Sequence, residues 1–542
     1  MICNPSRNEE LMTNFKKIVK YFLIFLAFLL LLPFDSRKEI YLIIFFSLSL
    51  FTLVILPFFY NKSKLYSFNV YLDHHAISKL GQSVYNINFR DKTKYLFFYL
   101  KKSLIDLYSD VWNYVTSNPL LVLSYIYLGA KMLAYQYLLL AVPNSAVFKS
   151  KGSGAGEDRY FTGLLIADIL GTAWDSVHFL DIAKYGYTDV PGHFIGTWVF
   201  GPFYPYLISL LSNFLNFINS SPFGFIFDYL GIRIAAGNFY AFSGVLIANA
   251  FSFIAMYLFY KITLFYLNKN KTNIKEIRQT KVKATFATAV FLFFPTNFAY
   301  MMVAYSESVF VTFCMLSFYF FILAREKSKQ GKKTKLMYLS SFCAAIAYLT
   351  RIPGGLIFLI LGLICAYNVI KYLYRRNWNE FGKAFTDGLK ISSFFVIPYI
   401  WGIYESSNGI DITILQKAIW DQELKFPLGG YTYFFRPMNI NVLPLFEFWG
   451  YVLLILILGV SSYKYSWHLT LYSVIFVFLY TSVTGIGAFA IVRYLGTIWP
   501  AFIIFSELKS KEGRYIVVGL VLYFFTVGLY DLTRWSLRLF WG

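Results

Sequence analysis

The sequence predicts an all-α polytopic membrane protein, and three observations support this fold class. The 542 residues are 58% hydrophobic and only 14% charged, whereas soluble domains carry about a quarter charged residues. Apolar runs such as Ile40–Tyr60 and Leu120–Ala141 recur along the chain, and they reach the roughly 20 residues that a spanning helix needs. Lys and Arg concentrate in the short segments between these runs, as in membrane proteins of several spans.

The net charge of +21 could also indicate a nucleic-acid partner. Its distribution argues against one, because the basic residues lie between apolar runs, where the preference of positive loops for the cytoplasmic side accounts for them. The sequence contains no soluble basic domain or aromatic–basic patch that would carry nucleic-acid binding. We therefore expect membrane lipids, and no nucleic acid, as partners.

The four cysteines give no sign of a disulfide framework or a zinc site, because no CxxC pair or His–Cys spacing is present. The predicted external loops also lack a cluster of acidic residues at ligand spacing. Carboxylates from separate loops could still meet around an ion. We predict no cofactor and no metal ligands, and a divalent ion stays open.

Residues 1–118 are expected to form two N-terminal transmembrane helices followed by a basic amphipathic cytoplasmic segment. Basic residues precede the first apolar run, as in a signal sequence, but a second span follows at once and no small-residue cleavage site is present. A retained anchor is therefore favoured. The remaining residues, 119–542, are expected to form the transmembrane catalytic domain.

Charged loops predict the orientation of this second domain. Asn268–Lys283 and Arg325–Lys335 each carry six Lys or Arg against one Glu, so both are expected to be cytoplasmic. About forty residues between them allow two spans joined by an external turn near Pro295–Ser308. When the chain is assumed to change sides with each further span, the turn Leu349–Gly355 lies outside and Gly485–Tyr494 lies near the external face.

A long external loop is predicted at 142–199, carrying short interfacial helices. The apolar segments that follow this loop cannot both be single spans that run in the same direction across the membrane. Either Phe200–Ile218 lies along the interface or re-enters the membrane, or Phe223–Ile234 crosses back. We favour the interfacial interpretation, which gives about thirteen transmembrane helices.

This topology brings ionisable residues from four distant segments to one face of the membrane. Asp175 and His178 lie in the first external loop, Glu307 and Arg351 at the next two external turns, and Arg493 near a later one. Ionisable groups at the ends of spans that face a common cavity indicate a functional site. For any one of them, the alternative is an ordinary interfacial polar residue.

The stretch "WDSVHFLDIAKYG" reads as a short helix. Asp175 is placed as the N-cap, Ser176–Lys184 as the body and Gly186 as the terminator. His178 lies within one turn of Asp175, and Trp174 shares its face. Plain capping by Asp175 and an interfacial position for His178 are the alternatives to a catalytic role.

These residues resemble the PIG-V family, which comprises the second mannosyltransferase of GPI-anchor assembly and its prokaryotic relatives. The stretch "WDSVHFLDIAKYGY" is similar to the family's luminal signature, and "FGPFYPYLI" resembles its Phe-Pro-rich stretch. Further on, "AYSESVF" and "LTRIPGGL" resemble the Tyr-Ser-Glu-Ser and Thr-Arg elements. Two positions depart from the family pattern, because His193 is a loose match and Gly201 replaces an aromatic residue.

The resemblance implies a GT-C fold and an inverting transfer of a hexose, mannose being favoured, from a polyprenyl- or dolichyl-phosphate donor. The acceptor would be a glycolipid or another lipid-linked molecule on the external or luminal face, as in the synthesis of GPI-anchor-like glycolipids. Asp175 and His178 are the predicted catalytic residues. Arg351 and Arg493 are predicted to bind the donor phosphate, and Trp174, His193 and Glu307 to bind the acceptor.

The alternative function is a polytopic transporter or lipid flippase, since many helices with buried charges also describe one. The predicted charges lie at span ends on one side, which favours a one-sided active site over alternating access. The membrane is expected to be the plasma membrane of a prokaryote, or the endoplasmic reticulum membrane in a eukaryote.

Overall fold

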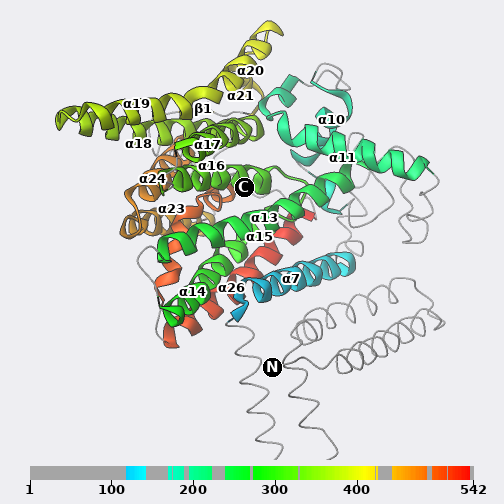
Figure 1. The fold of residues 1–542 in the computed structure, drawn as a ribbon. Coiled ribbons are helices and arrows are strands. Elements are labelled where there is room, and N and C mark those ends of the chain that lie inside the picture. Colours follow the sequence, from blue (N-terminus) through cyan, green and yellow to red (C-terminus); the bar gives the residue numbers. More distant parts are fainter. Residues whose placement is uncertain are drawn as a thin grey trace, which may run out of the picture. The chain divides into compact units, whose positions relative to one another are not determined.

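A computed structural model describes residues 117–141, 169–173, 175–187, 195–221, 239–268, 273–326, 330–420, 423–424, 442–484, 491–508 and 511–536. The chain divides into two compact units, 1–136 and 137–542. Of the first unit the structure describes the greater part of helix α7 (Pro119–Ala141), which confirms that the apolar run at 120–141 is helical. The other labelled elements of Figure 1 belong to the second unit.

The second unit is built from helices, as predicted. Within the described ranges, four segments are long and apolar enough to cross a membrane: Tyr240–Asn268, Glu307–Glu326, Ile352–Tyr374 and Tyr515–Thr533. Two shorter apolar helices accompany them. Two-residue strands, β1 (Glu423–Leu424) and β2 (Val483–Thr484), form one antiparallel pair. The predicted total of about thirteen spans stays a prediction, because residues 1–116 lie outside the described ranges.

The centre of the unit is a row of packed helices. Helix α16 (Glu307–Glu326) packs against α13 (Tyr240–Asn268) on one side and α17 (Gln330–Thr350) on the other. Helix α14 (Ile274–Phe293) follows α13 and packs back on it. Helix α13 carries small or hydroxyl side chains at buried positions, and such residues let helix backbones approach closely where no hydrophobic effect operates between spans.

Aromatic rings fill the core against which these helices pack. Trp499, in the 3₁₀ helix η10 (Trp499–Glu507), is fully buried. Its ring lies 5.7 Å from the ring of Phe318 and 5.5 Å from that of Tyr472, centroid to centroid. Phe259 stacks on Phe291 at 4.8 Å. Because large rings bury much apolar area with few rotatable bonds, they give a rigid core.

Four further elements close the core around η10. Helix α15 (Pro295–Tyr300) packs on α26 (Lys511–Ser536), while α23 (Val442–Ser461) and α24 (Trp467–Thr481) pair with each other and contact η10. The 3₁₀ helix η8 (Ser462–Lys464) joins α23 to α24.

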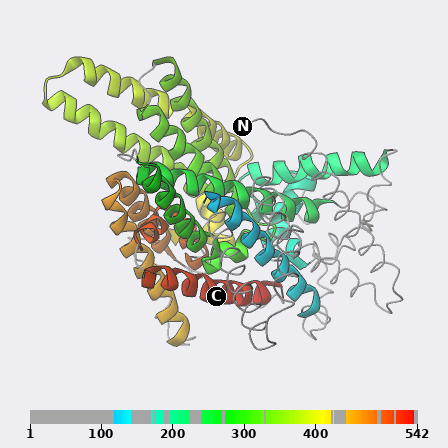
Figure 2. The ribbon, with the colours of Figure 1, turned by 60° about the horizontal axis from the view of Figure 1, so that its bottom comes forward.

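A helical hairpin extends from this body. Helix α18 (Gly355–Tyr374) packs on α19 (Trp378–Ser392), and the pair (yellow-green) projects beyond the rest of the unit in two views (Figure 1, Figure 2). The 3₁₀ helix η6 (Ser393–Phe395) continues α19 into α20 (Val396–Ser407). Helix α21 (Ile412–Trp420) follows.

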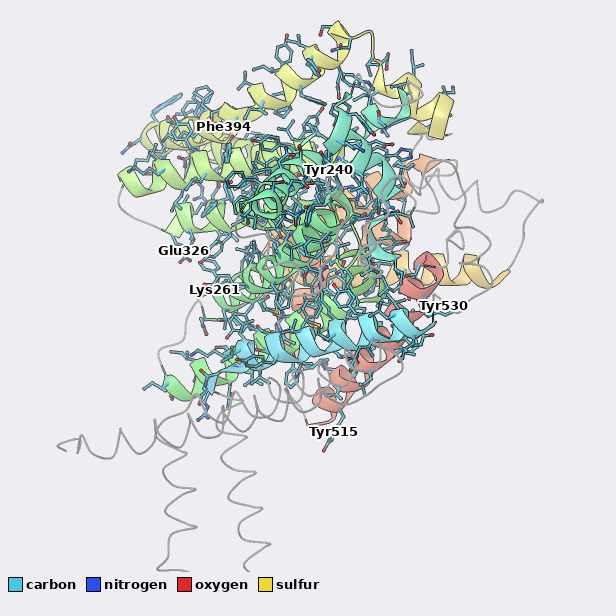
Figure 3. All side chains as sticks on the ribbon, turned by 90° about the vertical axis from the view of Figure 1, so that its right-hand side faces the viewer. Tyr240, Lys261, Glu326, Phe394, Tyr515 and Tyr530 are labelled. Carbon is cyan, nitrogen blue, oxygen red and sulfur yellow. The ribbon has the colours of Figure 1, made fainter. Side chains whose placement is uncertain are left out.

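The predicted sidedness agrees with the arrangement of α13 and α16. In Figure 3 the labelled Lys261, toward the end of α13, and Glu326, at the end of α16, lie on the same side, away from Tyr240 at the start of α13. Both basic loops follow these two ends directly. The first residue of α16, Glu307, therefore lies at the opposite end of the helices.

Helix α11 (Phe203–Ser220) covers most of the segment 200–218 and is amphipathic. Tyr204, Pro205, Ile208 and Ser212 are buried, whereas Tyr206, Leu210, Phe214 and Phe217 are exposed. It is not among the four candidate spans. The interfacial interpretation of this segment stays a prediction. The competing segment 223–234 lies outside the described residues.

Candidate active site

The short helix predicted around Asp175 is present as α10 (Asp175–Tyr185). Gly186 follows it with φ of +73°, a left-handed conformation that glycine adopts without strain. Its N–H donates to the carbonyl of Ile182 at 2.9 Å and ends the helix. Asp175 therefore occupies the N-terminal end of α10, where the helix dipole favours a negative charge.

Two backbone contacts hold the start of α10 against the turn that precedes α16. The Ala304 N–H donates to the carbonyl of Leu170 at 2.9 Å. The Asp175 N–H donates to the hydroxyl of Tyr305 at 3.2 Å. The first external loop and the predicted external turn at 295–308 are thus in contact, which brings Asp175 close to Glu307.

Glu307 is the central acid of the site. It is the first residue of α16, and its side chain is 4% exposed. The carboxylate oxygen Oε1 accepts a hydrogen bond from Arg351 Nη1 at 2.5 Å and lies 3.0 Å from Arg493 Nε. Its other oxygen, Oε2, is buried and has no hydrogen-bond partner among the described residues. Glu307 therefore holds both arginines through one oxygen.

Arg493 joins the two acids. It lies in α25 (Ile491–Leu495), and its Nη1 donates to Asp175 Oδ2 at 3.0 Å, while Nη2 donates to the Tyr494 hydroxyl at 2.8 Å. Burial by itself lowers the pKa of Arg493, but Tyr494, Glu307 and Asp175 outweigh it and raise the pKa well above its usual value. Arg493 is therefore a permanent cation that donates hydrogen bonds through Nη1 and Nη2, while its buried Nε makes an ion pair with Glu307 but no hydrogen bond with any described residue.

Arg351 is the less engaged of the two arginines. It follows α17 directly, and its backbone N–H donates to the Ala347 carbonyl at 2.9 Å. Its side chain is 17% exposed, against 12% for Arg493. Only Nη1 donates a hydrogen bond within the described part of the chain. The remaining guanidinium N–H groups are thus available to an anionic ligand.

Three tyrosines that the sequence did not single out surround the arginines. The guanidinium carbon of Arg493 lies 5.4, 5.1 and 4.8 Å from the ring centroids of Tyr300, Tyr305 and Tyr494, and Arg351 lies 4.6 Å from that of Tyr494. These distances are typical of cation–π contacts. The signal was present, because Tyr305 lies inside "AYSESVF" and Tyr494 follows Arg493.

The sequence-predicted site residues divide into three groups. Asp175, Glu307, Arg351 and Arg493 form one ion-paired cluster, which we call the carboxylate–arginine centre. His178 takes no part in these ion pairs, and its ring stacks on Phe200 with centroids 5.3 Å apart. Trp174 and His193 lie outside the described residues.

The carboxylate–arginine centre balances two negative and two positive formal charges. Each of the two carboxylates is paired with at least one guanidinium group. Within the described ranges, no group of three or more His, Cys, Asp or Glu side chains is placed to hold a metal ion.

The packing around Gly201 explains why a glycine stands where the PIG-V pattern has an aromatic residue. A Cβ atom at this position would collide with the carbonyl of Leu349 and the backbone of Thr350. The segment that joins η3 (Ile195–Val199) to α11 therefore packs directly on the end of α17, next to Arg351. An aromatic residue could not occupy this position without moving one of the two segments.

We expect Gly201→Ala to destabilise the protein by about 1–3 kcal/mol, the usual cost of overpacking. Thermal unfolding of the full chain can be followed with a thiol-reactive dye, because Cys314, Cys343 and Cys365 are buried. Gly382→Ala, in α19, is the matched control, since a Cβ there meets nothing within 4 Å. An unchanged melting temperature for Gly201→Ala would contradict the close approach.

Glu307→Gln should destabilise the protein strongly. The substitution leaves two buried guanidinium groups without their shared carboxylate, and breaking a buried ion pair costs about 3–5 kcal/mol. The matched control is Glu380→Gln on α19, where the exposed pair with Lys383 contributes about 0–1 kcal/mol. The same dye assay compares the two variants. Equal melting temperatures would show that Glu307 does not hold the arginines together.

Comparison with known proteins supports a glycosyltransferase. Residues 199–406, less than half of the chain, match the family described as dolichyl-phosphate-mannose-protein mannosyltransferase. This segment contains Glu307 and Arg351, while Asp175 and Arg493 lie outside it. The matched family is not the PIG-V family that the motifs resemble. No curated protein sequence matches the chain.

Two crystal structures of ArnT from Cupriavidus metallidurans are distantly similar. The apo form has a TM-score of 0.35 at 9% identity and covers 67% of this chain and 71% of that one. The form bound to undecaprenyl phosphate has a TM-score of 0.38 at 9% identity, with 76% of each chain covered. Similarity this low carries no inference about the site. The family match at 199–406 and the four helices long and apolar enough to cross a membrane together support a multi-pass membrane glycosyltransferase.

Proposed function

We propose that this protein transfers mannose from a dolichyl- or polyprenyl-phosphate donor to a hydroxyl group of a glycolipid acceptor, with inversion at the anomeric carbon. The observation that carries the proposal is the carboxylate–arginine centre. It supplies a proton acceptor and phosphate-binding cations within one cluster at the predicted external ends of the helices. Those are the two kinds of group that the reaction requires.

Asp175 is the proposed general base. Its Oδ2 is held by Arg493, and its Oδ1 accepts no hydrogen bond from any described residue. The acceptor hydroxyl oxygen attacks the anomeric carbon and forms the new glycosidic bond, while its proton passes to Oδ1. The bond from that carbon to the phosphate oxygen breaks, and the lipid phosphate leaves with the electron pair. Attack opposite the leaving group gives inversion.

Arg351 is the proposed principal ligand of the donor phosphate. It donates one hydrogen bond against two for Arg493 and is somewhat more exposed, and a guanidinium binds phosphate through paired hydrogen bonds. Charge on the leaving phosphate grows in the transition state, so a positioned cation lowers the barrier. Arg493 contributes positive charge and orients Asp175.

Glu307 has two proposed roles, one for each oxygen. Oε1 positions the two arginines. Oε2, buried and without a hydrogen-bond partner among the described residues, is suited to accept a hydrogen bond from an acceptor hydroxyl. His178 remains a proposed hydrogen-bond partner near Asp175, and Trp174 and His193 remain proposed acceptor contacts.

The choice of mannose and of a dolichyl-type phosphate rests on two similarities. The family matched at 199–406 is named for dolichyl-phosphate-mannose, and the motifs around Asp175 and Glu307 resemble the PIG-V family. The PIG-V resemblance also supports a glycolipid acceptor of the GPI-anchor type. A plasma-membrane location in a prokaryote is the proposed setting.

The test is a transfer assay with the full-length protein in lipid nanodiscs and membrane glycolipid extracts as acceptors. We expect radiolabelled mannose to pass from dolichyl-phosphate-mannose to lipid, and the product to have the opposite anomeric configuration to the donor. Dolichyl-phosphate-glucose and GDP-mannose serve as comparison donors. Transfer from GDP-mannose alone would overturn the lipid-phosphate donor, and preferential transfer of glucose would overturn the choice of mannose.

A further inference from the structure

A further carboxylate, outside the carboxylate–arginine centre, is buried among aromatic rings. Glu405, in the last turn of α20, is 5% exposed. Its Oε1 is buried without a hydrogen-bond partner among the described residues. No Lys, Arg or His of the described ranges forms an ion pair with it. Its carboxylate thus lacks a counter-charge there.

Two physical effects oppose this placement. Burial of a charge without a partner is costly. An anion near the C-terminal end of a helix meets the negative end of the helix dipole. Neither of these costs is offset by an ion pair in the described part of the chain. A stabilising role does not account for Glu405, whereas a ligand that donates hydrogen bonds to Oε1 would.

The aromatic rings around Glu405 come from three separate segments. Tyr187 follows α10, Trp198 lies in η3, and Trp401 and Tyr404 lie on the same face of α20 as Glu405. The ring centroids of Tyr187 and Trp198 are 4.7 Å apart, and Trp401 lies 5.4 Å from Tyr187 and 5.3 Å from Tyr404. We call these four rings and Glu405 the aromatic–carboxylate cluster. Helix α21, which follows α20, packs on η3 (Figure 1).

Two links join this cluster to the carboxylate–arginine centre. The Tyr187 hydroxyl donates to the carbonyl of Phe200 at 2.6 Å, and the Phe200 ring stacks on His178, one turn from Asp175. On the other side, the charge of Glu405 acts on Tyr348. Tyr348 lies in the last turn of α17, three residues before Arg351. The cluster is therefore joined through Phe200 to α10, the helix that begins with Asp175.

We propose that the aromatic–carboxylate cluster is a carbohydrate subsite that binds a sugar ring of the acceptor. The inference rests on the proposed glycosyl transfer. The Tyr404 ring, 42% exposed, offers a flat apolar surface for the C–H face of a sugar, and Glu405 Oε1 accepts hydrogen bonds from its hydroxyl groups. The acceptor explains the cluster better than the donor, since the donor phosphate is bound through Arg351 and its lipid chain lies in the membrane.

Binding can be measured without sugar transfer. The full-length protein in nanodiscs, free of sugar-based detergent, is titrated with methyl α-D-mannopyranoside, and quenching of Trp fluorescence is recorded. We expect saturable quenching that weakens at least tenfold in Glu405→Gln and in Tyr404→Ala. Tyr399→Ala is the matched control, because Tyr399 is an exposed residue of the same helix and makes no ring contact with the cluster. It should bind as the wild type does.

The outcomes separate the subsite from the proposed function. Equal affinity in all four proteins, or no saturable quenching in the wild type, would overturn the subsite. Binding of tetramethylammonium in place of the sugar would also overturn it and show a cation site. Sugar binding that depends on Glu405, in a protein that transfers no mannose, would overturn the proposed transfer alone. Should Glu405→Gln fail to fold, Tyr404→Ala carries the test, because the exposed ring can be removed without opening the core.

Discussion

Asp175→Asn is expected to lower the rate of mannose transfer by about 10²- to 10⁴-fold, the usual contribution of a positioned proton acceptor. The amide keeps the size of the side chain and can still accept a hydrogen bond from Arg493, so we expect only a modest change in melting temperature. The effect should fall on kcat, because the proton moves in the chemical step. The measurement is transfer from dolichyl-phosphate-mannose in nanodiscs at saturating donor.

Glu380→Gln is the matched control for this substitution, since it makes the same carboxylate-to-amide change on the exposed face of α19. It should leave the rate unchanged. Full activity of a folded Asp175→Asn protein would remove Asp175 from the catalytic role. Glu157, Asp158 and Asp168, three other carboxylates of the predicted external loop, would then be the residues to test.

Substitution of Arg351 is expected to have the second largest effect. Arg351→Gln should lower kcat/KM for the donor by about 10²- to 10³-fold, in line with the loss of one electrostatic contact to a developing charge. Arg351→Lys should recover part of this loss, because it restores the charge but not the planar pair of donors. Steady-state kinetics with varied dolichyl-phosphate-mannose measure both variants.

The comparison with Arg493 makes this prediction specific. Arg493 already donates to Asp175 and Tyr494, so Arg493→Lys should mainly lower kcat through the orientation of Asp175 and raise the donor KM less. Arg375→Gln is the control, since Arg375 follows α18 at the end of that helix remote from Arg351. It should change neither kcat nor the donor KM. A donor KM that rises more in Arg493→Lys than in Arg351→Gln would reverse the proposed roles.

Local patterns predicted much of the fold. The alternation of apolar runs and basic loops indicated a helical membrane protein, and the two basic loops follow the ends of α13 and α16 that lie on one side (Figure 3). The helix at Asp175 and its end at Gly186 were also predictable, because capping and the left-handed conformation depend on neighbouring residues alone.

The same patterns could name the site residues but not their contacts. Asp175, Glu307, Arg351 and Arg493 were singled out because each lies in or near a predicted external loop or turn. Their pairing was not predictable, since Asp175 and Arg493 are 318 residues apart. The difference between the two arginines, and the tyrosine rings around them, depend on how α10, α15, α16 and α25 pack.

Gly201 and Glu405 show most clearly what could not be predicted from the sequence. In the sequence, Gly201 was only a departure from the PIG-V pattern. The structure gives the reason, because the close approach of the Leu349 backbone leaves no room for a side chain at this position. Glu405 carried no signal at all. The sequence by itself determined the membrane class and the helices, because hydropathy, charge and capping act over a few residues. Only the tertiary structure decided which charges neutralise one another and which carboxylate stays unpaired, because those energies depend on distances between segments far apart in the chain.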